Sequence, residues 1–461
     1  MRVQRNRRGD RFVVTTNGRG VESHTGGALL RLAADRFSLT GRLRAALDSV
    51  RSWDTHAPGV VVRDLAVVMA LGGRAISDIE TLRHRHRKLL GKAASEPTAW
   101  RTLEAIAADD LAVSRLFDAV AAAREQVWGL GATPPGWDDP TKAAYVDLDA
   151  TLLTSHSDKA QAAGTYKGGF GFSPILAFLD RGDGRGEPLG LLLRPGNAGP
   201  NNVDDNADVL EQALAWLPPR PAGKPLVVRG DSAMATRGFV TYARAAGVKV
   251  SVSLPIGVHP RVQTAIRALH THADAWTPAV RQDRSVRDGA HVAELTDVAL
   301  DGWPDGLRII VRREPLHPGA QQTLDDIDGH RFTAVLTDVA GDDIVALDAD
   351  HRARAHIEDR IKDAKDTGLA NLPCGDFDRN AAWAAVVMVA LTLVCWTQTL
   401  LLDGELALAR PPTLRYRLWH VAARVAHHAR RTFIHLDADW PWAAELQQAF
   451  QRLFALPIPD G

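Results

Sequence analysis

Between residues 144 and 254 short apolar runs alternate with amphipathic ones, and this pattern limits the possible folds more than any other feature. Runs of strand length lie near residues 144 to 149, 175 to 179, 188 to 194, 225 to 230 and 248 to 254. The first three follow closely, as in an antiparallel meander, whereas helices predicted near 205 to 216 and 234 to 246 separate the later ones, as parallel crossovers require. The pattern predicts an α/β fold with a mixed five-stranded sheet flanked by helices.

Changes in composition divide the chain into five regions. Pro and Gly between residues 131 and 139 end a basic helical region, and polar turns with short apolar runs follow residue 254. We expect a helical, basic region at 1–135, the first part of the α/β core at 140–254, a β-rich insertion at 255–331, the second part of the core with a charged helix at 332–402, and a helical C-terminal region at 403–461.

One apolar run, from Ala381 to Leu402, is long enough to cross a membrane. It is rich in alanine and carries three threonines and a glutamine, so we interpret it as a buried helix and expect no membrane partner. The two cysteines lie in or beside apolar helical stretches, and the basic N-terminus is followed by no apolar signal core. A reducing, cytoplasmic location is therefore predicted.

Three acidic residues far apart in the chain could meet at one edge of the predicted sheet. Asp149 ends the strand in A-A-Y-V-D-L-D-A-T, Asp231 ends the strand in P-L-V-V-R-G-D-S, and Glu358 lies in a charged helix near 353–366. Asp147 points to the same strand face as Asp149 and is the alternative ligand or a nearby supporting acid. Carboxylate oxygens suit Mg²⁺ or Mn²⁺, and two such ions can activate water and stabilise a leaving oxygen in phosphodiester chemistry.

Each acid also has a plainer interpretation. Asp231 followed by Ser232 could be a helix cap or turn former, and the charged helix could carry a surface ladder of ion pairs. On an ideal helix, however, Arg354, Glu358 and Lys365 fall within roughly 40° of one another, so one stripe places a carboxylate between two cations. Two other acids already end strands in a sheet that this helix could cover, which favours the metal-site hypothesis.

Local charge favours a nucleic-acid partner although the chain is formally neutral, with 55 basic and 55 acidic residues. Basic residues outnumber acidic ones by about two to one in the first hundred residues, and no acid occurs between residues 406 and 436. The residues that we expect to contact DNA in these segments are Arg83, Arg85, Arg87 and Lys88, and Arg424, Arg430 and Arg431. A solvated helix face is the alternative for the first group.

A glycine-rich segment, K-G-G-F-G-F at 167 to 172, lacks the spacing of a phosphate-binding loop and does not lie between a strand and a helix. An ordinary turn is the preferred interpretation, and a flexible loop near DNA is the alternative.

The spacing Arg354-x₃-Glu358-x₆-Lys365 resembles the signature around the catalytic glutamate of DDE transposases from bacterial insertion sequences of the fourth group, in which a Tyr stands where this chain has His351. The motifs D-L-D-A-T, R-G-D-S, H-I-E-D-R-I-K-D and N-A-A-W extend this resemblance. With them, nearly the whole chain is similar to the actinobacterial branch of the insertion sequence thirteen-eighty family.

This resemblance implies an RNase H-like core with a β insertion before the glutamate, a metal-binding triad of Asp149, Asp231 and Glu358, and two Mg²⁺ ions, with Mn²⁺ as a substitute. Arg354 and Lys365 would hold phosphates, and the His351 imidazole could also contact one. The expected function is DNA transposition, in which terminal inverted repeats are cleaved and a 3′-hydroxyl is joined to target DNA. The expected partners are double-stranded DNA and a second copy of the chain, in the nucleoid.

Two other functions would use some of the same residues. A non-cutting DNA-binding protein or repressor derived from such an enzyme would not need an intact triad. A glycosidase would use paired acids without metal, but the chain has only 6% aromatic residues to form sugar platforms.

Overall fold

The computed structural model describes residues 4–5, 11–12, 20–155, 158–296, 298–321 and 326–458, and its dominant element is a mixed nine-stranded sheet. From edge to edge the strands are β12 (Thr277–Val280), β13 (Val286–Leu295), β14 (Arg308–Pro315), β15 (His330–Thr337), β11 (Lys249–Leu254), β10 (Leu226–Gly230), β4 (Ala144–Ala150), β8 (Ile175–Asp180) and β9 (Gly186–Leu192). The α/β class predicted from the sequence is confirmed, but the sheet has nine strands rather than five.

The five strands predicted from the sequence are neighbours in this sheet. β4, β8 and β9 form an antiparallel meander, and β10 runs parallel to both β4 and β11. Three of the four additional strands, β12, β13 and β14, come from the insertion. The fourth, β15, lies almost entirely in the second part of the predicted core and pairs with β11 on one side and with β14 on the other. The insertion therefore extends the main sheet instead of forming a separate one.

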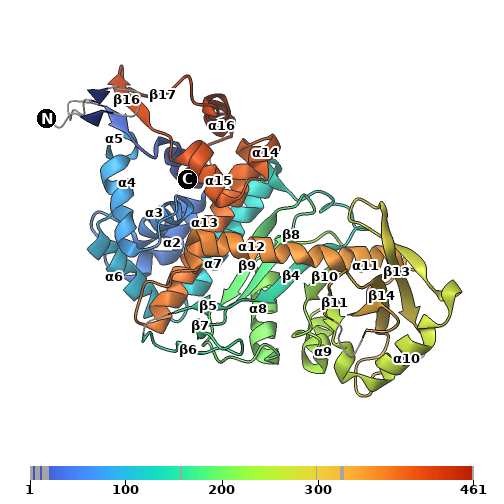
Figure 1. Cartoon of the computed structure of the whole chain (residues 1–461). Helices are drawn as coiled ribbons and strands as arrows, with labels where there is room; N and C mark the ends of the chain where they lie inside the picture. Colours follow the sequence, from blue (N-terminus) through green and yellow to red (C-terminus); the bar gives the residue numbers. More distant parts are fainter. Residues whose placement is uncertain are drawn as a thin grey trace.

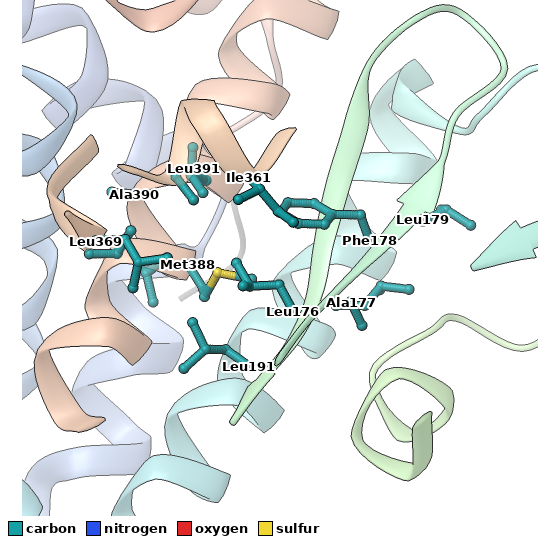
Figure 2. Packing of buried hydrophobic residues seen from close by; sticks show 14 of the residues in the cluster. Leu176, Ala177, Phe178, Leu179, Leu191, Ile361, Leu369, Met388, Ala390 and Leu391 are labelled. Atoms are coloured by element: carbon teal, nitrogen blue, oxygen red, sulfur yellow. The ribbon is translucent and has the colours of Figure 1, made fainter. Parts of the chain in front are cut away.

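Helices cover both faces of the meander. The alternation along β8 directs Leu176 and Phe178 toward Ile361 and Met388, whereas Ala177 and Leu179 point to the opposite face (Figure 2). Ile361 lies on α12 (His356–Ala364), Met388 on α13 (Phe377–Leu401), and the opposite face is covered by α8 (Val203–Ala215). The remaining helices of the sheet region are α9 (Arg237–Ala245), α10 (Pro260–His270) and α11 (Ile344–Arg352).

Helix α13 is the axis of a helical lobe beside the sheet (Figure 1). Among the described residues it is the one helix long and apolar enough to cross a membrane, and 89% of its most apolar window is buried inside the protein. The helices that precede the sheet are α1 (Ala28–Arg36), α2 (Leu39–Leu47), α3 (Pro58–Ala70), α4 (Glu80–Arg85), α5 (Arg87–Leu90), α6 (Glu96–Ala107) and α7 (Ala112–Val127). Because α1, α3, α6 and α7 pack on it, α13 is a core helix of this lobe.

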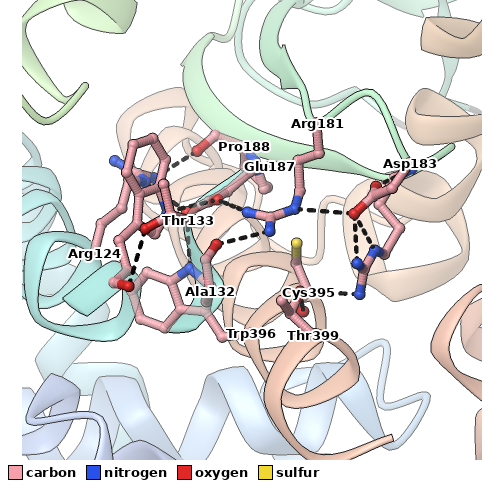
Figure 3. A network of polar contacts seen from close by, with 12 residues as sticks. Arg124, Ala132, Thr133, Arg181, Asp183, Glu187, Pro188, Cys395, Trp396 and Thr399 are labelled. Carbon is pink, nitrogen blue, oxygen red and sulfur yellow. Dashed lines mark hydrogen bonds and ion pairs between the residues drawn. The ribbon is translucent and has the colours of Figure 1, made fainter. Parts of the chain in front are cut away.

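A buried carboxylate joins the lobe to the sheet (Figure 3). Glu187 on β9 is fully buried and accepts hydrogen bonds from Arg124 on α7 (2.7 Å), from Arg181 (2.8 Å) and from the indole of Trp396 on α13 (2.7 Å). A carboxylate removed from water is tolerated only when such partners satisfy it. Glu187 therefore fixes the position of the lobe against the sheet edge.

The C-terminal region is not entirely helical, so that expectation is wrong. After α13 come α14 (Gly404–Ala407), α15 (Pro411–Leu414), a hairpin of β16 (Ala423–His428) and β17 (Arg431–Leu436), and α16 (Ala443–Ala455). β16 also pairs with β3 (Val21–Glu22) near the other end of the chain. The alternation of buried and exposed residues along β16 is typical of a strand, and its partner lies about four hundred residues away.

Candidate active site

Asp149 and Asp231 lie side by side where the C-terminal ends of β4 and β10 meet, and this end of the two strands is called the acidic edge. In the parallel pair of β10 and β4, Arg229 is opposite Asp147. Two residues further along each strand, the same register brings Asp231 level with Asp149, and neighbouring strands are about 4.8 Å apart. Asp231 follows the last residue of β10, and one of its carboxylate oxygens accepts the Ala233 N–H (2.9 Å) in a turn.

Glu358 comes to this edge from α12, which packs on β4. It lies in the first turn of that helix and is exposed. The charged helix predicted near 353–366 begins with a 3₁₀ turn, η7 (Ala353–Ala355), which leads from α11 into α12. Arg354 lies in that turn, and Lys365 begins a π-helical turn, η8 (Lys365–Leu369).

The three carboxylates interact electrostatically. Burial, then the charge of Asp231 and to a lesser extent that of Glu358, raise the pKa of Asp149 to about 6, against the opposing effects of Arg354 and the Ala150 N–H. The side chain of Asp149 is only 17% exposed, so solvent screens these charges weakly. The ends of β4 and β10 and the start of α12 therefore bring these acids close enough to influence the ionisation of Asp149.

Carboxylates that repel one another in this way fit a divalent cation, because a bound cation would relieve the repulsion and carboxylate oxygens are its preferred ligands. Within the described part of the chain, however, no three acidic, histidine or cysteine side chains already converge as a ready coordination group. The fit of a divalent cation to this site therefore rests on the negative charge of the carboxylates and on their oxygen donor atoms.

The two cations of the sequence signature lie just before and just after α12, the helix that carries Glu358. An Nη1 atom of Arg354 is 3.9 Å from an Oδ2 atom of Asp149. Nζ of Lys365 donates to the Leu152 carbonyl (3.1 Å), three residues beyond Asp149. Both side chains are partly exposed and close to the end of β4, where a phosphate could reach them.

His351 does not lie where a phosphate contact would place it. Its ring is buried, and its two nitrogens are 2.9 Å and 3.0 Å from the hydroxyls of Ser251 and Ser253 on β11. Burial, followed by the charges of Arg354 and Arg229, lowers the pKa of His351 to about 3, so the ring is neutral. The predicted phosphate contact is thus replaced by a structural contact between α11 and the sheet.

Asp147 is held in a buried ion-pair cluster that the sequence analysis missed. Its carboxylate accepts from Arg229 (2.6 and 2.9 Å) and from Arg360 on α12 (2.7 Å), and both arginines also contact Asp180 at the end of β8. Asp147 is completely buried. Since the guanidinium groups occupy its oxygens, Asp149 is the acid of this strand that is accessible for a ligand.

A basic cavity of about 390 Å³ lies beside Arg354 and was also missed. Its lining includes Arg312 on β14, Arg331 and Phe332 on β15, and Arg352 at the end of α11. The insertion thus contributes cations next to the acidic edge. In the sequence these arginines are scattered through strands, and only the pairing of β14 with β15 brings them together.

The remaining predicted DNA contacts lie on the helical lobe. Arg83 pairs with Glu80 (3.1 Å) and Arg87 is exposed, whereas the side chains of Arg85 and Lys88 lie outside the described residues. Three exposed residues of the β16–β17 hairpin complete the set: Arg424, Arg430 and Arg431. Leu89 of α5 and Ile434 of β17 line a common cavity of about 800 Å³, so two segments distant in the sequence form one neighbourhood.

Comparisons with known proteins identify the family. The profile of the family described as "Transposase DDE domain group 1" matches residues 4–458. Among solved structures, a chain of the cryo-EM structure of a piggyBac transposase synaptic complex with hairpin DNA aligns over 86% of this chain and 80% of its own length, at 8% identity and a TM-score of 0.41. No curated protein matches the chain. Because the family profile spans nearly the whole sequence, the chain belongs to the group 1 family of DDE-domain transposases.

Proposed function

We propose that this protein cleaves DNA at the terminal inverted repeats of an insertion sequence and joins the released 3′-hydroxyl to target DNA. Membership of the DDE transposase family supports DNA transposition and phosphodiester chemistry in general. The observation that carries the specific proposal is the coupling of Asp149 with Asp231 and Glu358, three acids from three elements at one edge of the sheet.

The proposed core is RNase H-like. The five neighbouring strands β9, β8, β4, β10 and β11 form an antiparallel meander followed by two parallel strands, which supports this assignment. In this arrangement the C-terminal ends of β4 and β10 bring Asp149 and Asp231 to the same edge, and α12 supplies the third acid, Glu358. The insertion strands extend the sheet and place cations beside the acids.

In the proposed reaction, water attacks a phosphodiester at the transposon end, and the 3′-oxygen leaves as a hydroxyl while the 5′ side keeps the phosphate. The released 3′-hydroxyl then loses its proton and attacks a target phosphodiester, whose own 3′-oxygen leaves. Asp149, Asp231 and Glu358 would hold divalent ions, with two Mg²⁺ proposed and Mn²⁺ as a substitute; when bound, such ions stabilise the attacking and leaving oxygens. Arg354 and Lys365 would orient the phosphates by charge.

DNA held by the basic neighbourhood of α4, α5 and the β16–β17 hairpin would reach the acidic edge, and joining two transposon ends would use two copies of the chain. A nucleoid location follows from DNA binding.

The test is a cleavage assay on DNA that carries the inverted repeats flanking the gene, with Mg²⁺. Asp231→Asn and Glu358→Gln should bind this DNA with unchanged affinity and leave it uncut, because each removes a charge from the acidic edge but no contact of the helical lobe. Asp305→Asn, at an exposed acid of the insertion, is the matched control and should cleave normally. Full cleavage by Asp231→Asn would contradict the proposal, and binding without cleavage by the wild type would indicate a repressor.

A further inference from the structure

The glycine-rich segment is the tip of a small hairpin beside the acidic edge. β6 (Ala163–Gly164) and β7 (Phe170–Phe172) form a three-stranded sheet with β5 (Leu153–Thr154), which begins just after β4 ends. The Thr165 N–H donates to the Gly169 carbonyl (2.8 Å), and the Gly168 N–H donates to the Thr165 carbonyl (3.0 Å). Gly168 has φ of 78°, and a Cβ on Gly171 would lie 1.9 Å from the Leu153 carbonyl oxygen, so the glycines are needed to form the hairpin.

This hairpin exposes two aromatic side chains. Tyr166 is 67% exposed and Phe170 is 44% exposed, whereas Phe172 on the same strand is buried. Lys167 is also exposed, and its Nζ lies 5.6 Å from the centre of the Tyr166 ring. Two large aromatic side chains on one short hairpin thus expose apolar ring surface that is available to another molecule.

The hairpin tip is electrostatically linked to the helix that carries Glu358. Burial, and then the charge of Lys167, lower the pKa of Lys365. Lys365 follows the last residue of α12 and donates to the Leu152 carbonyl, at the start of the segment that leads into β5. A cation, two aromatic rings and the acidic edge are therefore neighbours.

We propose that the hairpin tip, defined by Tyr166, Lys167 and Phe170, binds unpaired nucleotides of a DNA end next to the phosphate that is cut. Aromatic rings stack on any base, and a lysine between them pairs with the backbone, which is the combination found in proteins that bind single strands. The positive charge at the tip favours a nucleic acid over a second copy of this chain as the occupant. This inference rests on the proposed function, because it assigns part of the same DNA substrate.

The test compares the binding of two short DNA duplexes, one with an unpaired end and one with blunt ends, by fluorescence anisotropy in EDTA. Tyr166→Ala and Phe170→Ala should each weaken binding of the unpaired end by roughly 5- to 150-fold, the range expected for loss of one stacked base, and should change blunt-end binding much less. Lys167→Ala should lower the salt dependence of unpaired-end binding by about 0.7 in the log–log slope.

Trp100→Ala is the matched control, since this ring is 37% exposed on α6, outside the segments assigned to DNA contacts, and should leave the preference for the unpaired end unchanged. Tyr166→Trp should retain that preference because it keeps a stacking surface. The inference would be overturned if the wild type and the Ala variants bound both duplexes equally. It would also be overturned if the Ala substitutions abolished self-association and left DNA binding unchanged. The binding assay contains no metal and does not depend on cleavage. A wild type that fails this test but still cleaves inverted-repeat DNA with Mg²⁺ would contradict the inference and leave the proposed function intact.

Discussion

Replacing Asp149 with Asn should stabilise the metal-free protein at neutral pH while it removes a catalytic acid. The pKa of Asp149 is about 6 in the folded protein, compared with an ordinary value of 3.8. The folded state therefore keeps the proton to higher pH than the unfolded state. For an acid with a raised pKa, the folded protein loses stability as the pH rises between these two values and regains none above them.

The difference of about two pKa units corresponds to about 3 kcal/mol at 1.36 kcal/mol per unit. Since the side chain is only 17% exposed, little of this is lost to solvent screening. Asn has nearly the same shape and no charge, so the stability of Asp149→Asn relative to the wild type should increase by up to about 3 kcal/mol from about pH 4 to about pH 7. The change with pH is the informative quantity, because any loss of hydrogen bonds in the variant is the same at each pH.

Urea unfolding monitored by circular dichroism, with a chelator present, measures this difference. Asp305→Asn, at an exposed acid, is the control and should show no such trend. Adding Mg²⁺ at neutral pH should stabilise the wild type and not Asp149→Asn, since only the wild type would bind the ion. A stability difference that stays constant with pH would refute the raised pKa of Asp149, which burial and the charges of Asp231 and Glu358 produce.

Three further predictions concern other parts of the molecule. Glu187→Gln should lower the free energy of unfolding by about 3–5 kcal/mol, because it leaves buried guanidinium groups without a carboxylate. In urea unfolding the exposed control Glu405→Gln should cost less than about 1 kcal/mol, and equal losses of stability in the two variants would contradict this prediction. Arg360→Met should slow cleavage more than it weakens DNA binding, because Arg360 positions α12 through Asp147; a rate equal to that of the wild type would exclude this role. Arg431→Ala should weaken DNA binding at any sequence and reduce its log–log salt slope by about 0.9, measured by anisotropy, and an unchanged slope would exclude a phosphate contact.

Local patterns were sufficient to predict the strands of the meander and the two parallel strands. The apolar runs coincide with β4, β8, β9, β10 and β11 to within a few residues. Pairing across the sheet was not predictable in the same way. β15 joins the insertion to the main sheet through residues that are distant in the sequence, and β16 pairs with β3 at the opposite end of the chain. Such partners are selected by tertiary packing, which a period of two residues does not encode.

The ambiguity between Asp147 and Asp149 shows the same limit at the candidate site. Both residues point to one face of β4, so spacing alone could not separate them. The separation comes from Arg229, which the parallel register places opposite Asp147, and from Arg360, which reaches the same carboxylate from α12. In the sequence Arg360 looks like one more charge on a solvated helix. Its burial becomes visible only when the helix is packed against the sheet.

Locating bound Mn²⁺ tests the central claim most directly. Crystals of the protein soaked in Mn²⁺ and measured at the manganese absorption edge should show anomalous density between Asp149, Asp231 and Glu358, and this density should disappear in Asp231→Asn. Density only at other sites, or density that persists unchanged in Asp231→Asn, would contradict a shared metal site at this edge of the sheet.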